Sequence, residues 1–145
     1  MTIQRIDHVG VVVDDLAAAT AFFVELGFEV LGEWSGEGEV VDRIVGLEGV
    51  RTDVAMVQAP DGRGRLELIR FNAPPAGGGD ARAPANTHGL RHLALVVDDI
   101  DATLAGLRRH GADLFGEVQQ AGDSYRLCYV RGPAGIIVEL AEPLG

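Results

Sequence analysis

Four residues of this chain have the types and the spacing of a metal site: His8, Glu67, His92 and Glu139. Two neutral imidazoles and two carboxylates form a donor set of intermediate softness. Such a set suits Ni, Zn, Co, Mn or Fe(II), and does not suit a calcium site built from oxygens alone. One divalent ion held in this way can act as a Lewis acid toward adjacent oxygens of a bound substrate and stabilise an enediolate. A neighbouring carboxylate can then accept the proton.

The four residues belong together because the sequence contains the same pattern twice. Residues 6–33 align without a gap on residues 90–117 at a constant offset of 84, which places one histidine on the other. The stretch PDGRGRLEL at 60–68 resembles PAGIIVEL at 133–140, which places one glutamate on the other. A duplicated unit with equivalent histidines and glutamates can build one pseudo-symmetric site.

Each of the four side chains also has an ordinary structural interpretation. A histidine in a strand is commonly a plain strand residue, and each glutamate can pair with an arginine, for which Arg65 and Arg126 are the candidates. Both glutamates lie in the middle of apolar segments, where a buried carboxylate needs a partner or a cation. The recurrence of both residue types at equivalent positions favours the metal site.

Each half of the chain is predicted to be a βαβββ module. Asp14-Asp15 and Asp98-Asp99 are natural N-caps, and Gly27 and Gly111 end the helices that follow them. Segments rich in β-branched and aliphatic residues indicate strands, and the glycine and proline turns separate them. The predicted strands are 6–13, 28–34, 52–58 and 65–71, then 90–97, 112–118, 125–131 and 136–142, with helices at 16–26 and 100–110.

We expect one structural domain with residues 1–71 as the first module and 89–145 as the second. Residues 72–88 (NAPPAGGGDARAPANTH) form an exposed, mobile connector. Residues 36–52 have no counterpart in the second half, and their apolar residues predict a short helix. This segment is either a packing insertion or a wall or lid over a pocket, with Arg43 or Arg51 available to an anionic ligand.

Composition limits the classes of partner. The chain carries a formal net charge of −10 and has arginine as its only basic residue apart from histidine, which disfavours a nucleic-acid partner. No apolar run approaches the roughly 20 residues that span a bilayer, and the N-terminus has no hydrophobic signal core, so we expect no membrane partner. The lone cysteine, Cys128, cannot form an internal disulfide, which favours a cytoplasmic location.

The stretches DHVGVVVDDL, LRHLALVVDDI and YRLCYVRGPAGIIVEL resemble the vicinal oxygen chelate superfamily. That superfamily includes glyoxalase I, methylmalonyl-CoA epimerase, extradiol dioxygenases, and the fosfomycin and bleomycin resistance proteins. The resemblance covers essentially the whole chain. It implies an α+β fold in which two tandem βαβββ modules form an eight-stranded, cup-shaped mixed sheet with the helices outside, in a homodimer.

The resemblance also allows the proposed metal ligands to be compared with those of individual superfamily members. The order His8, Glu67, His92, Glu139 is similar to that of bacterial-type glyoxalase I. Epimerases usually have Gln at the second position, whereas extradiol dioxygenases and fosfomycin transferases have no ligand there. Bleomycin-type binders generally lack the metal set. The resemblance therefore implies that all four residues hold the ion, with Glu139 as the first candidate for the base and Glu67 as the second.

The substrate is expected to be a small oxygenated molecule of low polarity. Val12 stands where bacterial glyoxalase I carries an arginine for the glutathione carboxylate. Strand parity places Val12, Val96 and Ile69 on the faces of the site residues, which predicts an apolar pocket. Trp34 and Tyr125 are candidate pocket or dimer contacts.

The function predicted from the sequence is that of a metal-dependent, glyoxalase-like lyase, isomerase or epimerase that moves a proton on a metal-chelated substrate. Two alternatives remain open. One is a non-catalytic protein that sequesters an antibiotic or metabolite. The other is an extradiol-type dioxygenase, which is disfavoured because Glu67 would crowd the open coordination that oxygen chemistry requires.

Overall fold

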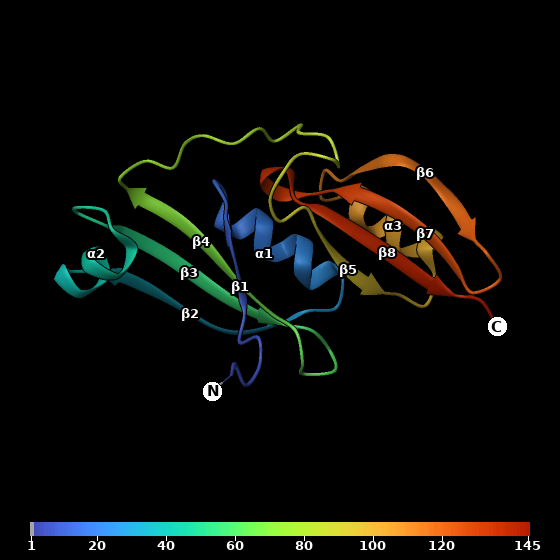
Figure 1. Ribbon diagram of the computed structural model, residues 1–145, viewed down its shortest axis with the longest axis horizontal. Coiled ribbons are helices and arrows are strands. Elements are labelled where there is room, and N and C mark those ends of the chain that lie inside the picture. Colours follow the sequence, from blue (N-terminus) through green and yellow to red (C-terminus); the bar gives the residue numbers. More distant parts are fainter. Residues whose placement is uncertain (1) are drawn as a thin grey trace. The chain divides into compact units, whose positions relative to one another are not determined.

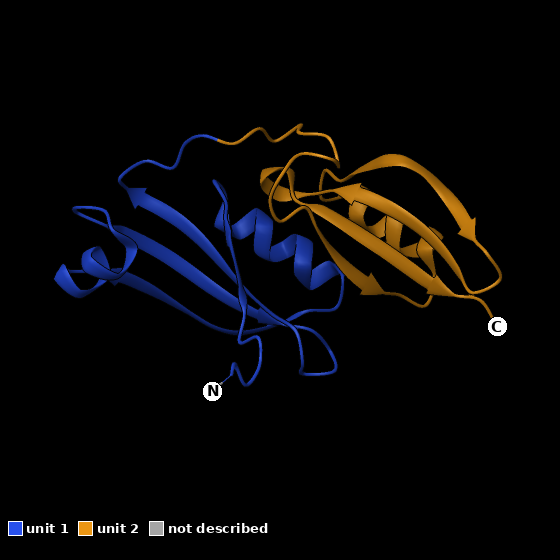
Figure 2. Cartoon of the chain, viewed as in Figure 1, with its two compact units in different colours: residues 1–78 blue, residues 79–145 orange. Residues whose placement is uncertain are grey.

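The structure, a computed structural model, describes residues 2–145 and divides into two compact units between Gly78 and Gly79 (Figure 2). The division lies inside the predicted connector. Within the described residues, no helix is long and apolar enough to cross a membrane. Each unit contains a four-stranded mixed sheet and has the predicted order of one strand, one main helix and three strands (Figure 1).

Unit 1 has the sheet order β1-β4-β3-β2, with β1 parallel to β4 and the other pairs antiparallel. The helix α1 lies against one face of this sheet (Figure 1). Strand β1 is shorter than predicted: its pairing with β4, which begins at Arg65, runs from Val9 to Val12. Its elements are β1 (Val9–Val12), α1 (Leu16–Glu25), β2 (Glu29–Glu37), α2 (Glu39–Val45), β3 (Arg51–Gln58) and β4 (Arg65–Ala73).

Unit 2 repeats this topology in the order β5-β8-β7-β6, again with the first strand parallel to the last. A short 3-10 helix replaces the hairpin turn before its last strand. Its elements are β5 (His92–Val96), α3 (Ile100–Arg108), β6 (Asp113–Ala121), β7 (Tyr125–Arg131), the 3-10 helix (Pro133–Gly135) and β8 (Ile137–Pro143). The α+β fold of two βαβββ modules is therefore confirmed.

The predicted caps explain where the two main helices begin. The side chain of Asp15 accepts a hydrogen bond from the Ala18 amide at 2.9 Å, and that of Asp99 accepts one from the Ala102 amide at 3.0 Å. Each bond satisfies one of the free amides in the first helical turn. Beyond the helices the chain turns at Gly27 through a φ of 102°, a conformation that glycine adopts without steric cost.

The core of each unit lies between its main helix and its sheet. In unit 1, α1 buries Phe22 and Phe23 completely against a sheet face that includes Leu66 and Leu68. In unit 2, Leu107 of α3 and Leu140 of β8 are fully buried. Because side chains alternate along a strand, the residues between these core positions point to the opposite face of each sheet, where the predicted site residues lie.

The segment 36–52 forms the predicted short helix, and the buried residues of the segment follow that helix. Helix α2 runs from a glycine N-cap to Gly46 and buries none of its residues. Packing falls instead to Val50, which is buried and whose amide donates to the Asp42 carboxylate at 2.8 Å. Arg43 points away from the core, with 77% of its side chain exposed, and pairs with Glu39 at 3.7 Å.

The connector is only partly the exposed, mobile linker that was predicted. Ala83 is buried, and the guanidinium of Arg131 donates hydrogen bonds to the carbonyls of Ala81, Ala83 and Gly135 at 2.8–3.2 Å. Composition failed to indicate this, because the bonds use backbone carbonyls, which every residue carries. The part of the connector from residue 79 onward is thus fastened to unit 2.

Candidate metal centre

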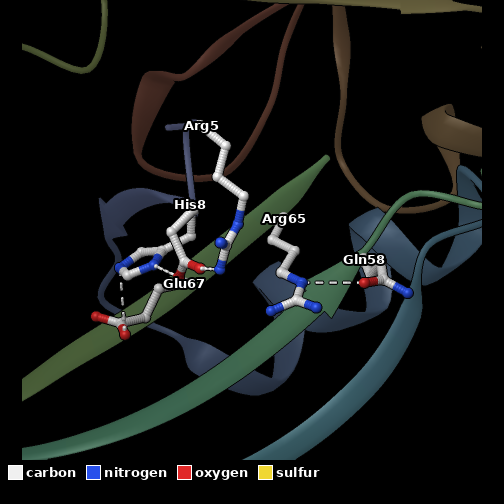
Figure 3. Close-up of polar contacts among 6 residues, drawn as sticks. Arg5, His8, Gln58, Arg65 and Glu67 are labelled. Atoms are coloured by element: carbon white, nitrogen blue, oxygen red, sulfur yellow. Dashed lines mark hydrogen bonds and ion pairs between the residues drawn. The ribbon is translucent and has the colours of Figure 1, made fainter. Parts of the chain in front are cut away.

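In unit 1 the structure brings His8 and Glu67 together (Figure 3). His8 directly precedes β1, and the parallel pairing of β1 with β4 places Gly10 beside Glu67. The two site residues therefore lie on the same face of the sheet. Their side chains point toward one another, with 3.6 Å between His8 Nε2 and Glu67 Oε2.

A short chain of polar contacts orients the His8 ring. Its Nδ1 lies 2.8 Å from Oδ2 of Asp7, and the other oxygen of Asp7 accepts a hydrogen bond from Arg5 at 2.8 Å. The hydrogen bond with His8 is the main reason that the pKa of Asp7 is lowered, and the bond from Arg5 adds to it. A carboxylate on Nδ1 favours the tautomer that leaves Nε2 free to bind a metal ion.

Unit 2 holds the equivalent pair in the same way. Strand β5 is parallel to β8, with Ala94 beside Glu139, and His92 is the first residue of β5. The distance from His92 Nε2 to Glu139 Oε1 is 4.0 Å. The ring of His92 is packed against Tyr129, with 5.1 Å between the ring centroids.

The arginine pairing that was the ordinary alternative does not occur. Arg65 donates to Gln58 at 3.0 Å (Figure 3), and Arg126 pairs with Asp101 and Glu142. Among residues 2–145, no arginine forms an ion pair with Glu67 or Glu139, whose side chains are 24% and 23% exposed. Among the described residues, the recorded ion-pair partner of each of these half-buried carboxylates is a histidine.

Each pair fits two ligands of one metal ion. Two donors bound at about 2.0–2.2 Å to the same ion lie roughly 3 to 4 Å apart, and the two pairs are separated by 3.6 and 4.0 Å. The donors are imidazole nitrogen and carboxylate oxygen, which match a divalent transition metal. Within the part of the chain that the structure describes, no group of three or more His, Cys, Asp or Glu is arranged to hold an ion. The structure thus shows two separate His–Glu pairs.

The sequence and this fold together agree with one family of proteins. A family model described as the glyoxalase/bleomycin resistance protein/dioxygenase superfamily matches residues 5–140. The chain belongs to that superfamily.

Individual members of the superfamily are similar over nearly their whole length. YwbC of Bacillus subtilis (strain 168) is 31% identical over 141 residues, which are 96% of this chain and 98% of YwbC. The crystal structure of a glyoxalase family protein from Bacillus cereus is 43% identical with a TM-score of 0.95, and the match covers 100% of this chain and 97% of that one. TnmS3, an antibiotic binding protein from Streptomyces sp. CB03234, is 26% identical with a TM-score of 0.62, and the match covers 99% and 98% of the two chains.

The residues predicted to line a substrate pocket lie on different elements of the two units. Val12 and Ile69 are register partners in β1 and β4, on the same face as Glu67. Val96 lies on the Glu139 face of unit 2 and is 72% exposed. Arg43, on the exposed helix α2, pairs with Glu39. Among the described residues it has no recorded contact with the His8–Glu67 pair.

Two aromatic residues beside the unit 2 pair were missed by the sequence analysis. Tyr129 is the register partner of both Glu139 and Phe115, so all three side chains share one face. The rings of Phe115 and Tyr129 are stacked at 6.4 Å, and Arg131 lies over Phe115 at 4.4 Å. Strand parity counted back from Glu139 across the hairpin would have identified Tyr129, because the turn between β7 and β8 is short.

Proposed function

We propose that this superfamily member is a metal-dependent, glyoxalase-like enzyme of the lyase, isomerase or epimerase type. In this proposal His8, Glu67, His92 and Glu139 hold one divalent ion, which is Ni, Zn, Co, Mn or Fe. The main support is the repeated approach of an imidazole nitrogen to a carboxylate, at 3.6 and 4.0 Å, with no arginine paired to either carboxylate among the described residues. A bound ion would supply Lewis acidity toward two adjacent oxygens of a small substrate.

The side chains around the pairs have separate tasks in this proposal. The Glu139 side chain is half-buried, and its carboxylate accepts the proton from the carbon next to the chelated oxygen. Glu67 is the second candidate for this base. Asp7 holds the tautomer of His8 through its contact with Nδ1. Tyr129 and Phe115 offer an aromatic wall on the Glu139 face, and Val12 with Ile69 offer an apolar one on the Glu67 face.

The metal is tested first, without any substrate. Protein purified without chelator is analysed for metal content next to the double variant His8→Ala/Glu67→Ala. The matched control is His88→Ala/Glu29→Ala, which removes the same residue types at exposed positions. We expect about one ion per chain in the wild type and the control, and loss in the site variant. An absence of uptake from Ni, Zn, Co, Mn or Fe(II) solutions would refute the proposed cofactor.

Proton abstraction is tested next with a simple probe. Hydroxyacetone in D₂O is incubated with metal-loaded protein, and the exchange of its carbon-bound protons is followed by NMR. Substitution of Glu139 by Gln should stop catalysed exchange while circular dichroism and the melting temperature show an intact fold. If Glu139→Gln exchanges protons as fast as the wild type, Glu139 is not the base.

A second function is supported by the similarity to TnmS3, which is an antibiotic binding protein. In that alternative the aromatic and apolar side chains next to the pairs hold an antibiotic or metabolite without chemistry. It predicts tight binding of an aromatic compound, no dependence on metal, and no product after prolonged incubation. Stoichiometric metal combined with catalysed exchange would exclude it.

A further inference from the structure

Tyr129 lies beside both members of the His–Glu pair of unit 2. It is in β7, directly opposite Glu139 of β8 in the antiparallel register, so the two side chains leave the same face of the sheet. Side chains in such positions have Cβ atoms about 4.5–5.5 Å apart. The Tyr129 ring also packs against the ring of His92, with 5.1 Å between the centroids and 35° between the planes. A group that is bound at this pair is therefore next to Tyr129.

The hydroxyl group of Tyr129 is not used by the fold. Within residues 2–145, the one buried side-chain nitrogen or oxygen without a hydrogen-bond partner is Nε of Arg91. The Tyr129 side chain is half-buried, and its hydroxyl forms no recorded hydrogen bond among these residues, so this hydroxyl is open to solvent. It can therefore donate a hydrogen bond to a ligand on the Glu139 face.

The ring that carries this hydroxyl is fixed by its neighbours. Phe115 of β6 lies directly opposite Tyr129, and the two rings are stacked with 6.4 Å between their centroids. The guanidinium of Arg131 covers the Phe115 ring in turn, at 4.4 Å from its centroid. A ring with contacts to His92 and Phe115 holds its hydroxyl in one place, which a preorganised donor requires.

Unit 1 has no such donor at the equivalent position. Met56 of β3 lies directly opposite Glu67 of β4, as Tyr129 lies opposite Glu139. The thioether of Met56 cannot donate a hydrogen bond. The two carboxylates occupy equivalent places in the repeat, yet Glu139 has a hydroxyl donor opposite it and Glu67 does not.

Proton transfer from carbon creates the need for a donor of this kind. When a carboxylate takes the proton from a carbon next to a carbonyl group, the electron pair of the C–H bond forms a C=C bond. The π electron pair of the carbonyl group then moves onto its oxygen as negative charge. A hydroxyl that donates to this oxygen bonds more strongly to the charged form than to the neutral one, so it lowers the barrier. Base and donor must be adjacent, because they act on neighbouring atoms of one substrate.

From this difference we propose that Tyr129 is a catalytic residue, whose hydroxyl donates a hydrogen bond to the substrate oxygen that becomes negative while Glu139 takes the proton. The inference rests on the function proposed above and makes it more specific. It assigns the base to Glu139 and not to Glu67, and it names the substrate class as compounds with an acidic C–H next to a carbonyl group. The proton on Glu139 returns to one of the two carbons of the C=C bond, so no further reactant is needed.

The deciding variant is Tyr129→Phe, which removes the hydroxyl and keeps the ring against its neighbours. Metal-loaded protein is incubated with hydroxyacetone in D₂O at several concentrations, and proton exchange is followed by NMR. We expect kcat to fall about tenfold or more while KM changes by less than about threefold, because the hydrogen bond is strongest to the charged oxygen.

The matched control is Tyr125→Phe, which removes the same hydroxyl from the other tyrosine of the chain. Tyr125 is the first residue of β7 and is 40% exposed. It lies four residues from Tyr129 along the strand, about 13 Å away. This variant should exchange protons as fast as the wild type does.

Ligand binding gives a readout that does not depend on turnover. Acetohydroxamate carries two adjacent oxygens in one plane, as the deprotonated substrate does, and isothermal titration calorimetry measures its affinity for the metal-loaded protein. Tyr129→Phe should bind it about tenfold more weakly, since a hydrogen bond to a charged oxygen is lost. Tyr125→Phe should bind it as the wild type does. Metal content and the circular dichroism spectrum should be the same in all three proteins.

The outcomes separate this inference from the proposed function. If the wild type exchanges protons and Tyr129→Phe keeps its kcat or its affinity for acetohydroxamate, the inference is overturned and the proposed function stands. If Tyr129→Phe loses metal, the tyrosine acts through the His92 ring, which also overturns the inference. If the wild type neither takes up metal nor exchanges protons, the proposed function fails and the inference fails with it.

Discussion

Unit 1 and unit 2 present a histidine next to a glutamate on one face of the sheet, yet they differ in almost everything around that pair. His8 contacts the carboxylate of Asp7, whereas His92 is packed against the ring of Tyr129. The residue that corresponds to Asp7 in unit 2 is Arg91. A duplicated module has thus kept the donors and the strand register that presents them, while their supports have diverged.

The two units differ again in the turn between their last two strands. Gly62 in unit 1 and Gly135 in unit 2 have almost the same positive φ, 76° and 78°. Around Gly62 there is space, with only the tip of Gln58 within 4 Å of an added Cβ. Around Gly135 the added Cβ would meet the backbone of Ala81. The turn of unit 2 is therefore also a docking point for the connector.

The largest effect is expected from replacing these two glycines by alanine. Gly135→Ala brings its Cβ into a clash with the Ala81 carbonyl oxygen, so the connector must move. Together with the left-handed backbone we expect a loss of at least about 3 kcal/mol in the free energy of unfolding, measured by urea denaturation. Gly62→Ala carries only the backbone penalty, about 1–2 kcal/mol. Equal losses would show that the connector does not press on the turn.

The next effect comes from the guanidinium that holds the same connector. Arg131→Met keeps the apolar stem and removes the donors to the carbonyls of Ala81, Ala83 and Gly135, so we expect a loss of about 2–3 kcal/mol in the free energy of unfolding. The corresponding position in unit 1 is Gln58, which accepts a single bond from Arg65. Gln58→Met should cost about 1 kcal/mol or less. Limited proteolysis at residues 79–84 should accelerate in the arginine variant alone.

The supports of the two histidines give a third comparison, on metal affinity. If the proposed centre exists, Asp7→Ala removes the carboxylate on His8 Nδ1, and we expect the metal to bind about 10- to 100-fold more weakly. Arg91→Ala changes the equivalent position in unit 2, where the side chain donates to the Pro84 carbonyl and makes no recorded contact with His92 among the described residues. Its metal affinity should stay near that of the wild type in a chelator competition. Equal affinities in both variants would contradict a supporting role for Asp7.

Much of the fold was predictable because its signals are local. The capping aspartates, the glycines after the helices and the alternating apolar residues fix the order of elements. The strand parity that joins Leu66 and Leu68 on the core face also puts Glu67 on the other. The two His–Glu approaches follow from this parity and from parallel pairing of the first and last strands. The start of β1 was less predictable, since it depends on where its partner begins.

The fastened connector and the different charges next to the main helices were not predictable from local signals. Ala17 and Asp53, which lie far apart in the sequence, stand where unit 2 has Asp101 and Arg126, and Arg70 stands where unit 2 has Glu142. The sequence alignment alone relates Ala17 to Asp101, but the equivalence of Asp53 and Arg126 requires the register of the strands. Trp34 was noted as a possible pocket or dimer contact, and it pairs in register with Val54, which pairs with Ile69 on the Glu67 face.

The smallest predicted effect is a pH dependence of stability, which differs between the sheets of the two units. The hydrogen bond from Asn72, and then that from Ser35, lower the pKa of Asp53 below its ordinary value of 3.8. The ionised carboxylate therefore stabilises the folded state at pH values above 3.8, and this contribution disappears as the pH falls through the lower folded pKa. Arg126, at the equivalent position in unit 2, has its pKa raised, mainly by the hydrogen bond to Asp101, and stays charged throughout this range.

The check is a set of urea denaturation curves between pH 7 and pH 2.5 for the wild type, Asp53→Asn and Asn72→Ala. The stability gap between the wild type and Asp53→Asn should be constant at neutral pH and should shrink as the pH falls below about 4. Asn72→Ala removes the main hydrogen-bond donor to Asp53. At neutral pH its stability should therefore lie closer to that of Asp53→Asn than the stability of the wild type does. A gap of the same size at pH 7 and pH 2.5 would mean that the two donors do not favour the ionised form. In that case the hydrogen bonds of Asp53 would contribute to the fold of unit 1 independently of its charge.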